Sequence, residues 1–183
     1  MHCSHEGMTL SRRLAVALVA LACAAVLFRG QIASGLVSRG DEFAQSGDPT
    51  RALVYYERAY RLDAAPDAAE RYAFTSLMLK QTSTLSRAVA VASAALERKP
   101  QEEALLVDRA LCLNALGEYS AARGDFELIA QRTGDPRYYE FAAQAARRAG
   151  ERTRAARLFA RVIALAPSFP AARRALARLK AGR

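Results

Sequence analysis

The side chains that could serve in acid–base or nucleophilic catalysis are scarce in this chain of 183 residues, and they lie apart. Its two histidines, His2 and His5, precede an apolar segment near the N-terminus, and Cys112 is the only cysteine in residues 33–183. Histidine is the usual general base and the usual partner of a catalytic cysteine. Histidine-based chemistry is therefore excluded from residues 33–183.

The paired carboxylates are equally poor candidates for a reaction centre. Asp41-Glu42 and Glu102-Glu103 are neighbours in the sequence, and adjacent residues do not face each other on a helix. The sequence also contains no glycine-rich phosphate loop. We therefore predict that the protein is not an enzyme and has no cofactor.

A metal site or a disulfide framework is not expected either. His2, Cys3 and His5 are close enough in sequence to hold a metal ion, but they crowd the end of the chain, and Met8 is an alternative start that would remove them. The remaining cysteines, Cys23 and Cys112, fall in the apolar segment and in an expected helix. No pair of the three cysteines is placed for a disulfide framework.

Recognition of anions is the chemistry that the composition favours. The formal net charge is +9, but residues 33–136 carry 12 Lys and Arg against 15 Asp and Glu (net −3). Residues 137–183 carry 12 against 2 (net +10). Arginine can hold a carboxylate or phosphate with two parallel hydrogen bonds. This region is either a binding surface or a solvated arginine-rich face. The residues that recur at helical spacing, and so share one side, are Arg137, Glu140, Gln144, Arg147 and Arg148.

The elements that would position these residues are indicated by a repeated Ser/Thr-x-Ala tripeptide. Successive copies are 36, 34 and 33 residues apart, and a fixed period in this range indicates a repeat array. Repeat arrays usually bind other molecules and seldom catalyse reactions. The four copies are Thr50-Arg51-Ala52, Ser86-Arg87-Ala88, Ser120-Ala121-Ala122 and Thr153-Arg154-Ala155.

Turn and stop residues accompany each copy in register. Glycine or serine stands three residues before the Ser/Thr, where glycine can close a helix with a positive φ. The Ser/Thr is expected to cap the next helix, and Asp67 and Asp135 to cap the first helices of two units. Each unit therefore reads as helix, turn, helix and stop. The turn residues are Gly47, Ser83, Gly117 and Gly150, and the stops are Pro66, Pro100, Gly134 and Pro167.

Small residues recur where the two helices of a unit should meet. Ala52, Ala88, Ala122 and Ala155 are the expected contact points on the second helices. Opposite them on the first helices we expect Gly40, Ser76, Ala110 and Ala143. Larger residues are expected to fill the wider spaces between hairpins: Tyr56, Phe126 and Phe159.

When the four copies are aligned, these recurring positions form columns that resemble the tetratricopeptide repeat (TPR) family over residues 33–167. The first copy is the most similar, and the second departs most, with Ser83 at the turn glycine and Ala92 at the aromatic column, so its turn is expected to be irregular. The resemblance implies an all-α, right-handed solenoid of about four helix hairpins. The alternative is a generic alanine-rich helical bundle, which would not keep four copies in one register. The implied units are repeats 33–66, 69–102, 103–135 and 136–167 and a capping helix at 169–180.

The resemblance also implies a concave binding groove lined by the first helix of each hairpin. It would be mildly apolar in the middle and basic at its C-terminal end, suited to a peptide or protein with acidic character. The family's carboxylate clamp is not reproduced, because Val37 and Asp41 occupy its first-repeat positions. The groove residues implied by the family columns are Asp41, Gln45, Lys80, Gln81, Asn114, Arg137, Glu140, Gln144, Arg147 and Arg148.

The N-terminal segment predicts membrane targeting. Ser11-Arg12-Arg13 precedes fifteen apolar residues, Leu14 to Phe28, which would span about 22 Å as a helix against a bilayer core of about 30 Å. We expect a short tail at 1–12 and an uncleaved signal-anchor at 13–32, with the arginine flank in the cytoplasm. The alternative is a signal peptide cleaved near Ala33-Ser34-Gly35, which would release the repeats.

Together these features predict a membrane-tethered adaptor of the bacterial envelope. The protein would span the inner membrane once, hold its repeats outside the cytoplasm, and bind a protein partner, for example during assembly of an envelope complex. The alternative is that the arginine-rich C-terminal repeat binds a polyanion, either anionic lipid or nucleic acid. Nucleic acid is the less favoured ligand because the repeats are expected outside the cytoplasm.

Overall fold

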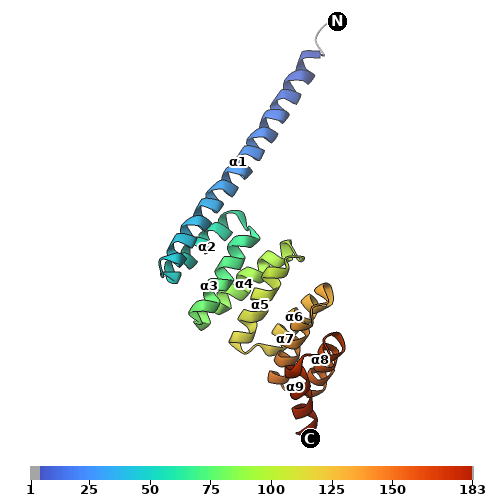
Figure 1. Ribbon diagram of the computed structural model, residues 1–183. Helices are drawn as coiled ribbons and strands as arrows, with labels where there is room; N and C mark the ends of the chain where they lie inside the picture. Colours follow the sequence, from blue (N-terminus) through green and yellow to red (C-terminus); the bar gives the residue numbers. More distant parts are fainter. Residues whose placement is uncertain (1–4, 183) are drawn as a thin grey trace.

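The chain folds as a stack of helix hairpins (Figure 1). The computed structural model describes the backbone of residues 5–182 and the side chains of Arg12 and residues 14–182. Helices α1 to α8 form four antiparallel hairpins in chain order, and α9 covers the last one, as the sequence predicted. The helices are α1 (His5–Gln45), α2 (Pro49–Asp63), α3 (Pro66–Leu79), α4 (Thr82–Arg98), α5 (Glu103–Leu116), α6 (Tyr119–Thr133), α7 (Pro136–Arg148), α8 (Arg152–Leu165) and α9 (Pro170–Ala181).

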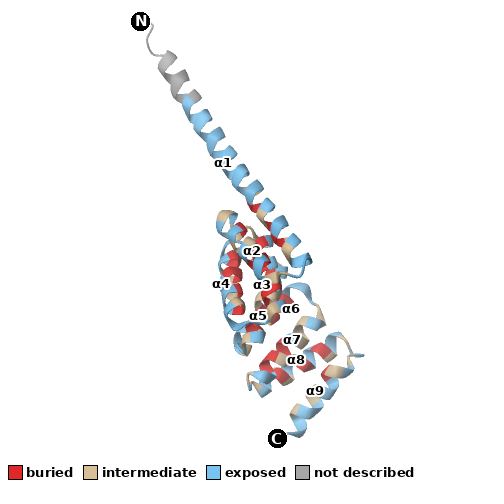
Figure 2. Cartoon of the chain, turned by 90° about the vertical axis from the view of Figure 1, so that its left-hand side faces the viewer, coloured by how far each residue is buried: buried red, intermediate tan, exposed pale blue. Residues whose placement is uncertain are grey.

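Helix α1 joins the apolar segment and the first repeat helix into one rod of 41 residues. It projects from the stack (Figure 1), and residues 14–32 are exposed apart from the half-buried Gly30, whereas only 3% of Ala33 is accessible (Figure 2). The expected tail at 1–12 is thus helical in its backbone from His5 onward. His2, Cys3 and the side chain of His5, the metal candidates of the sequence, lie outside the described residues.

The small residues lie where the paired helices touch. All four alanines of the second helices and the four small residues expected opposite them on the first helices are buried, as close-contact points require. The expected large residues, Tyr56, Phe126 and Phe159, are at most 2% exposed. Close packing of this kind needs short side chains on both helices, because interior packing leaves few voids and tolerates little excess volume.

The Gly40 site leaves no room for a side chain. A Cβ atom added there would lie 2.7 Å from Tyr56 Cδ1 and would also contact Cε1. The ring cannot easily move away, because the Tyr56 hydroxyl donates a 2.7 Å hydrogen bond to Asp41. Burial, and then that bond to a carboxylate, raise the pKa of Tyr56 to about 12, so the hydroxyl stays a donor at physiological pH.

The turns inside the hairpins follow the glycine pattern except in the second unit. Gly47, Gly117 and Gly150 adopt positive φ values of 79° to 84°. In the second hairpin Lys80 takes this role with φ 55°, and Ser83 lies inside α4. The turn therefore falls three residues earlier than the register predicts, which confirms the expected irregularity.

The predicted caps at the Ser/Thr column are wrong. Each of these residues lies inside its helix, and the preceding N-cap positions hold Asp48, Gln81, Glu118 and Glu151. Only Asp48 among them accepts a capping hydrogen bond, from the Arg51 N–H. The reason is that a single residue separates the left-handed turn position from the first residue of α2, α4, α6 or α8, so each helix starts before the Ser/Thr.

Of the two caps expected on first helices, one is correct. Asp135 accepts a hydrogen bond from the Arg137 N–H, and Pro136 occupies the first position of α7. Asp67 does not cap α3, because the helix already begins at Pro66 with Ala65 at its N-cap. Asp67 instead contributes negative charge to the first turn, which interacts favourably with the helix dipole.

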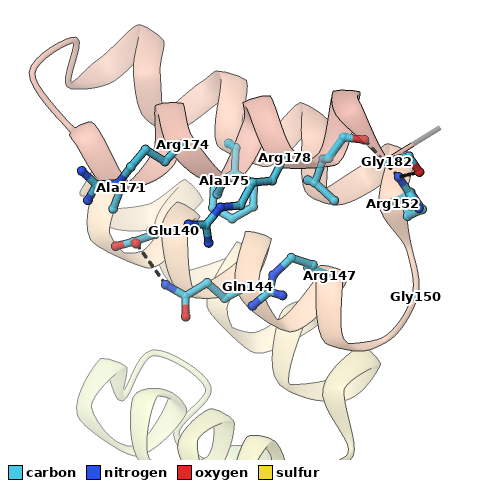
Figure 3. Close-up of a pocket in the computed structure, with 12 residues that line it drawn as sticks. Glu140, Gln144, Arg147, Gly150, Arg152, Ala171, Arg174, Ala175, Arg178 and Gly182 are labelled. Atoms are coloured by element: carbon cyan, nitrogen blue, oxygen red, sulfur yellow. Dashed lines mark hydrogen bonds between the residues drawn. The ribbon is translucent and has the colours of Figure 1, made fainter.

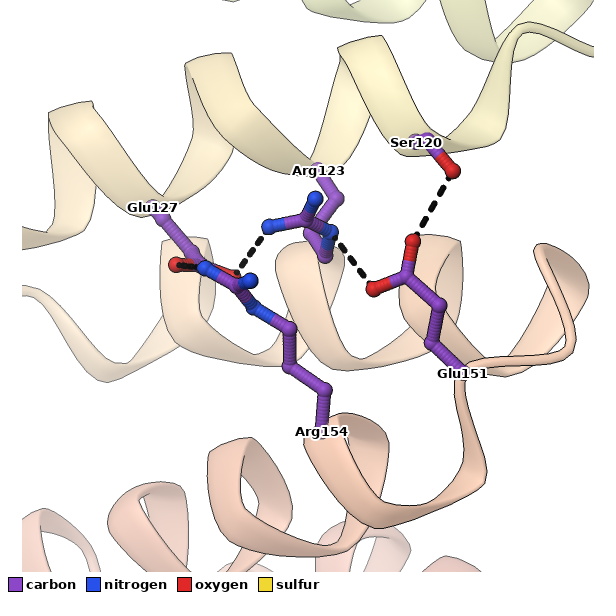
Figure 4. Close-up of polar contacts among 5 residues, drawn as sticks. All are labelled: Ser120, Arg123, Glu127, Glu151 and Arg154. Atoms are coloured by element: carbon purple, nitrogen blue, oxygen red, sulfur yellow. Dashed lines mark hydrogen bonds and ion pairs between the residues drawn. The ribbon is translucent and has the colours of Figure 1, made fainter.

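An ion-pair cluster joins the third and fourth hairpins on their second helices (Figure 4). The carboxylate of Glu127 on α6 forms ion pairs with Arg123 of its own helix (3.1 Å) and with Arg154 of α8 (2.8 Å). Arg123 also lies 3.0 Å from Glu151, which accepts a hydrogen bond from Ser120. Burial alone would raise the pKa of Glu127, but hydrogen bonds from Arg154 and Arg123 outweigh it and lower that pKa.

Replacing Gly40 with alanine should destabilise the fold. The added methyl group would press on the held Tyr56 ring, and overpacking of this kind costs about 1–3 kcal/mol, which exceeds the roughly 1 kcal/mol gained in helix propensity. Gly35→Ala is the matched control on the same helix, since its Cβ would meet nothing within 4 Å. Urea unfolding of the full chain in detergent should rank Gly35→Ala, wild type, Gly40→Ala in decreasing stability. A Gly40→Ala protein as stable as the control would contradict this packing.

Replacing Glu127 with glutamine should lower the free energy of unfolding by about 2 kcal/mol at neutral pH, because charge-assisted hydrogen bonds to two arginines are lost. Since the folded pKa of Glu127 is lowered, its contribution is present above about pH 4.5 and is lost as pH falls below that value. The difference from wild type should therefore shrink in acid. Glu97→Gln, at an exposed position on α4, should change little at either pH in thermal melts.

Candidate partner-binding groove

Two hollows of opposite charge lie along the first helices of the hairpins. The acidic hollow, about 940 Å³, is lined mainly by α1, α3 and Asp108 of α5. The basic hollow, about 870 Å³, lies between α7, α8 and α9. Cavities of 300–1,000 Å³ are in the range of ligand-binding sites. The charge separation found in the sequence is thus also a separation in space.

The basic hollow is lined by four arginines, one on α7, one on α8 and two on α9. Figure 3 shows Arg147 on one wall and Arg174 and Arg178 on the facing helix. Helix α9 presents its arginines here because its other face buries Ala172 and packs Leu176 against the core.

Three of these arginines have no carboxylate of the described residues within ion-pair distance: Arg147, Arg174 and Arg178. The fourth, Arg152, donates to the carbonyls of Leu179 (3.0 Å) and Gly182, so it closes the C-terminal end of α9. The acid of the hollow, Glu140, accepts a 3.0 Å hydrogen bond from Gln144. The hollow therefore offers unneutralised positive charge to a ligand.

The acidic hollow contains four carboxylates and one arginine. Arg71 donates a 2.7 Å hydrogen bond to Asp41, which leaves Asp67, Glu70 and Asp108 without a basic partner among the described residues. Half-burial, and then the charge of Glu70, raise the pKa of Asp108 to about 7. In the part of the chain that the structure describes, no three His, Cys, Asp or Glu side chains converge well enough to hold a metal ion.

Large apolar side chains also open into the acidic hollow. Phe74 is 60% exposed and Met78 is 68% exposed, one helical turn apart on α3. By contrast, Ala73 on the same helix is fully buried against the neighbouring helices. The apolar character of the acidic hollow therefore comes from Phe74 and Met78, neither of which is among the predicted groove residues.

Five of the ten predicted groove residues line these hollows. Asp41 and Gln45 lie in the acidic hollow, and Glu140, Gln144 and Arg147 lie in the basic hollow. The structure therefore divides the predicted set between two places.

The other five line neither hollow. Lys80 and Gln81 form the turn between α3 and α4. Arg137 pairs with Asp135 at the start of α7. Arg148 donates a 3.2 Å hydrogen bond to Asn114 and lies over the Tyr119 ring, so these residues connect the third and fourth hairpins.

Sequence reasoning missed the residues that give each hollow its character. Phe74 and Met78 are four residues apart, and Glu70 is four residues before Phe74, so this spacing would have placed all three on one face of α3. Arg174 and Arg178 lie on the capping helix, which the family columns do not assign to the groove. Only the packing of α9 on the last hairpin brings them to Arg147.

No protein-family model and no curated protein matches this sequence. Solved structures with a similar helix arrangement include a MamA double mutant (TM-score 0.68, 16% identity, 81% of this chain and 83% of the other) and MamA from Desulfovibrio magneticus RS-1 from residue 41 to its end (0.67, 17%, 81% and 84%). A tetratricopeptide repeat protein from Parabacteroides merdae is also similar (0.68, 17%, 82% and 59%). At these identities the likeness concerns the backbone alone, and it shows that the chain has a tetratricopeptide-repeat-like fold.

Proposed function

We propose that this protein is a membrane-tethered interaction scaffold that holds an acidic segment of a partner protein in its basic hollow. The observation that carries this proposal is the convergence of Arg147, Arg174 and Arg178 without a carboxylate partner among the described residues. Each guanidinium can bind a carboxylate through two parallel hydrogen bonds. A peptide with two or more acidic side chains, or an acidic C-terminus, would satisfy them together.

The tether is helix α1. The candidate span Leu14–Gln45 contains an 18-residue window of mean hydropathy 2.0, of which none is buried. An apolar helix that no other element covers argues against the core helix of a soluble protein, although a signal sequence has the same properties. We favour an uncleaved anchor because the helix continues without a break into the first hairpin, where Ala33 and Val37 are buried.

In this arrangement the hairpins lie directly beside the membrane. The buried part of α1 begins four residues after Arg29, which corresponds to about 6 Å along a helix. The flank Arg12-Arg13 favours a cytoplasmic N-terminus, so the hairpins face the other side of a bacterial inner membrane. A scaffold held in this way can capture partners as an envelope complex assembles.

The proposed ligand can be tested with a fluorescent peptide that ends in several glutamates. Arg174→Glu should weaken its binding to the full chain in detergent about tenfold, because a charge-assisted contact is worth roughly 1.5–3 kcal/mol. Arg173→Glu is the matched control: it makes the same charge change on the same helix, but Arg173 does not line the hollow. Equal losses in anisotropy titrations would show that the peptide responds only to overall charge and would refute the assigned site.

The polyanion alternative is decided with the same proteins. A single-stranded oligonucleotide and vesicles containing anionic lipid replace the peptide, and the salt dependence of each affinity is measured. If either binds more tightly than the acidic peptide and loses affinity steeply with salt, the basic hollow is a phosphate-binding surface and the protein-ligand proposal fails.

The tether predicts that the mature chain keeps its N-terminus and crosses the membrane. Intact-mass measurement of the protein extracted from membranes should show no cleavage after Gly35. Alkaline phosphatase fused at the C-terminus should be active, whereas a cytoplasmic fluorescent reporter at the same place should be dark. A shortened chain, or a fluorescent fusion, would contradict the single-pass arrangement.

A further inference from the structure

The acidic hollow exposes two apolar side chains, Phe74 and Met78, that do not belong to the hydrophobic core. Phe74 and Met78 point away from the core clusters, whereas Tyr72, Ala73 and Ser76 on the same helix are buried. Exposed apolar side chains that stand singly are ordinary, but two adjacent large ones inside a hollow indicate a contact surface. The flexible thioether of methionine suits it to partners of varied shape.

The charges around this pair determine what can cover it. Asp67 and Glu70 are on the same helix, Asp108 faces them from α5, and Arg71 is already paired with Asp41. A neutral or acidic partner would bury these carboxylates without a counter-charge, which is costly. A partner with lysine or arginine beside its apolar residues would neutralise them as it covers Phe74 and Met78.

We propose that the acidic hollow is a second docking site, which takes a cationic amphipathic segment of a partner protein. Its apolar side chains cover Phe74 and Met78, and its basic side chains pair with Glu70, Asp67 and Asp108. This goes beyond the proposed function, because it concerns another place on the molecule and a ligand of opposite charge. A single ligand with one basic end and one acidic end could occupy both hollows in only one orientation along the stack.

The ionised carboxylate of Asp108 in the acidic hollow lowers the stability of the folded protein. Its carboxylate is half-buried beside Glu70 and has no basic partner among the described residues, so its charged form is disfavoured. The titratable and charged groups around it are Glu70, Asp67 and Arg71 on α3, Asp41 on α1, Tyr56 on α2 and Cys112 on its own helix. A ligand cation placed here would remove the penalty, whereas packing alone would favour an uncharged residue.

The test uses a labelled helical peptide of leucine and lysine with an apolar face, and the same peptide with glutamate in place of lysine. The full chain in detergent should bind the lysine peptide at least tenfold more tightly at the acidic hollow than the glutamate peptide. Glu70→Lys and the double variant Phe74→Ser, Met78→Ser should each weaken the lysine peptide at least tenfold. Glu97→Lys, at an exposed position on α4 outside the hollow, should leave its affinity within twofold of wild type.

Asp108→Asn separates a binding role from a structural one. The raised folded pKa means that the ionised carboxylate destabilises the protein increasingly as pH rises from about 4 to 7. The variant should therefore melt at a higher temperature than wild type at pH 8 and at the same temperature near pH 4. It should nevertheless bind the lysine peptide several-fold more weakly at pH 8. A variant that is destabilised at pH 8, or that binds as well as wild type, would overturn the proposal.

Two further outcomes complete the design. Arg174→Glu should not weaken the lysine peptide, so failure of the basic hollow and failure of the acidic hollow are distinguishable. Analytical ultracentrifugation of wild type and of the Phe74→Ser, Met78→Ser variant tests whether another copy of the chain occupies the site. If the wild type forms oligomers that this variant lacks, the acidic hollow is an interface between copies, and the proposed partner is wrong.

Discussion

The close approach of two helices at a pair of small residues is the constraint on which this molecule depends. Gly40 approaches Tyr56 in this way, and the small residues at the corresponding positions of the next three hairpins are all buried. Because each hairpin is narrow at this point, its neighbours can stack on both sides and bury three core clusters, which partly buried side chains such as Val89 and Leu158 connect. Where the aromatic residue faces a glycine, the fit leaves no room for even one methyl group.

Some charged side chains of this molecule are paired between neighbouring helices, and others stay single in the two hollows. On the second helices α6 and α8, Glu127 pairs with Arg123 and Arg154. Arg109 of α5 makes the corresponding inward contact, with two hydrogen bonds to Asp125 and one to Ser93. On the hollow-lining sides of α3, α7 and α9, by contrast, several charges stay unneutralised by the described residues. Ion pairs therefore join neighbouring helices, whereas each hollow keeps several charges that have no partner of opposite charge among the described residues.

Helix α1 connects this stack to the proposed membrane span as one continuous helix, without a linker between them. A flexible linker would let the hairpins turn freely, whereas a continuous helix transmits the direction of its apolar part to the first repeat. The orientation of both hollows relative to the membrane surface would then follow from the packing of Ala33, Val37 and Gly40 against α2. This rigidity arises because no proline or left-handed residue interrupts the sequence from Phe28 to Gln45.

The order of the hairpins, the helix-contact residues and most of the stops follow from the sequence by itself, since period, small residues and terminators act locally and recur in register. The caps and the turn of the second hairpin do not, because shifts of one to three residues depend on which backbone position takes the left-handed conformation. The hollows depend on tertiary structure to a greater degree. Asp108 comes to face Glu70, and Arg174 comes to face Arg147, only through the packing of separate helices. Local patterns specify which side of each helix is apolar, but the charge of a groove is the sum over helices that meet in space.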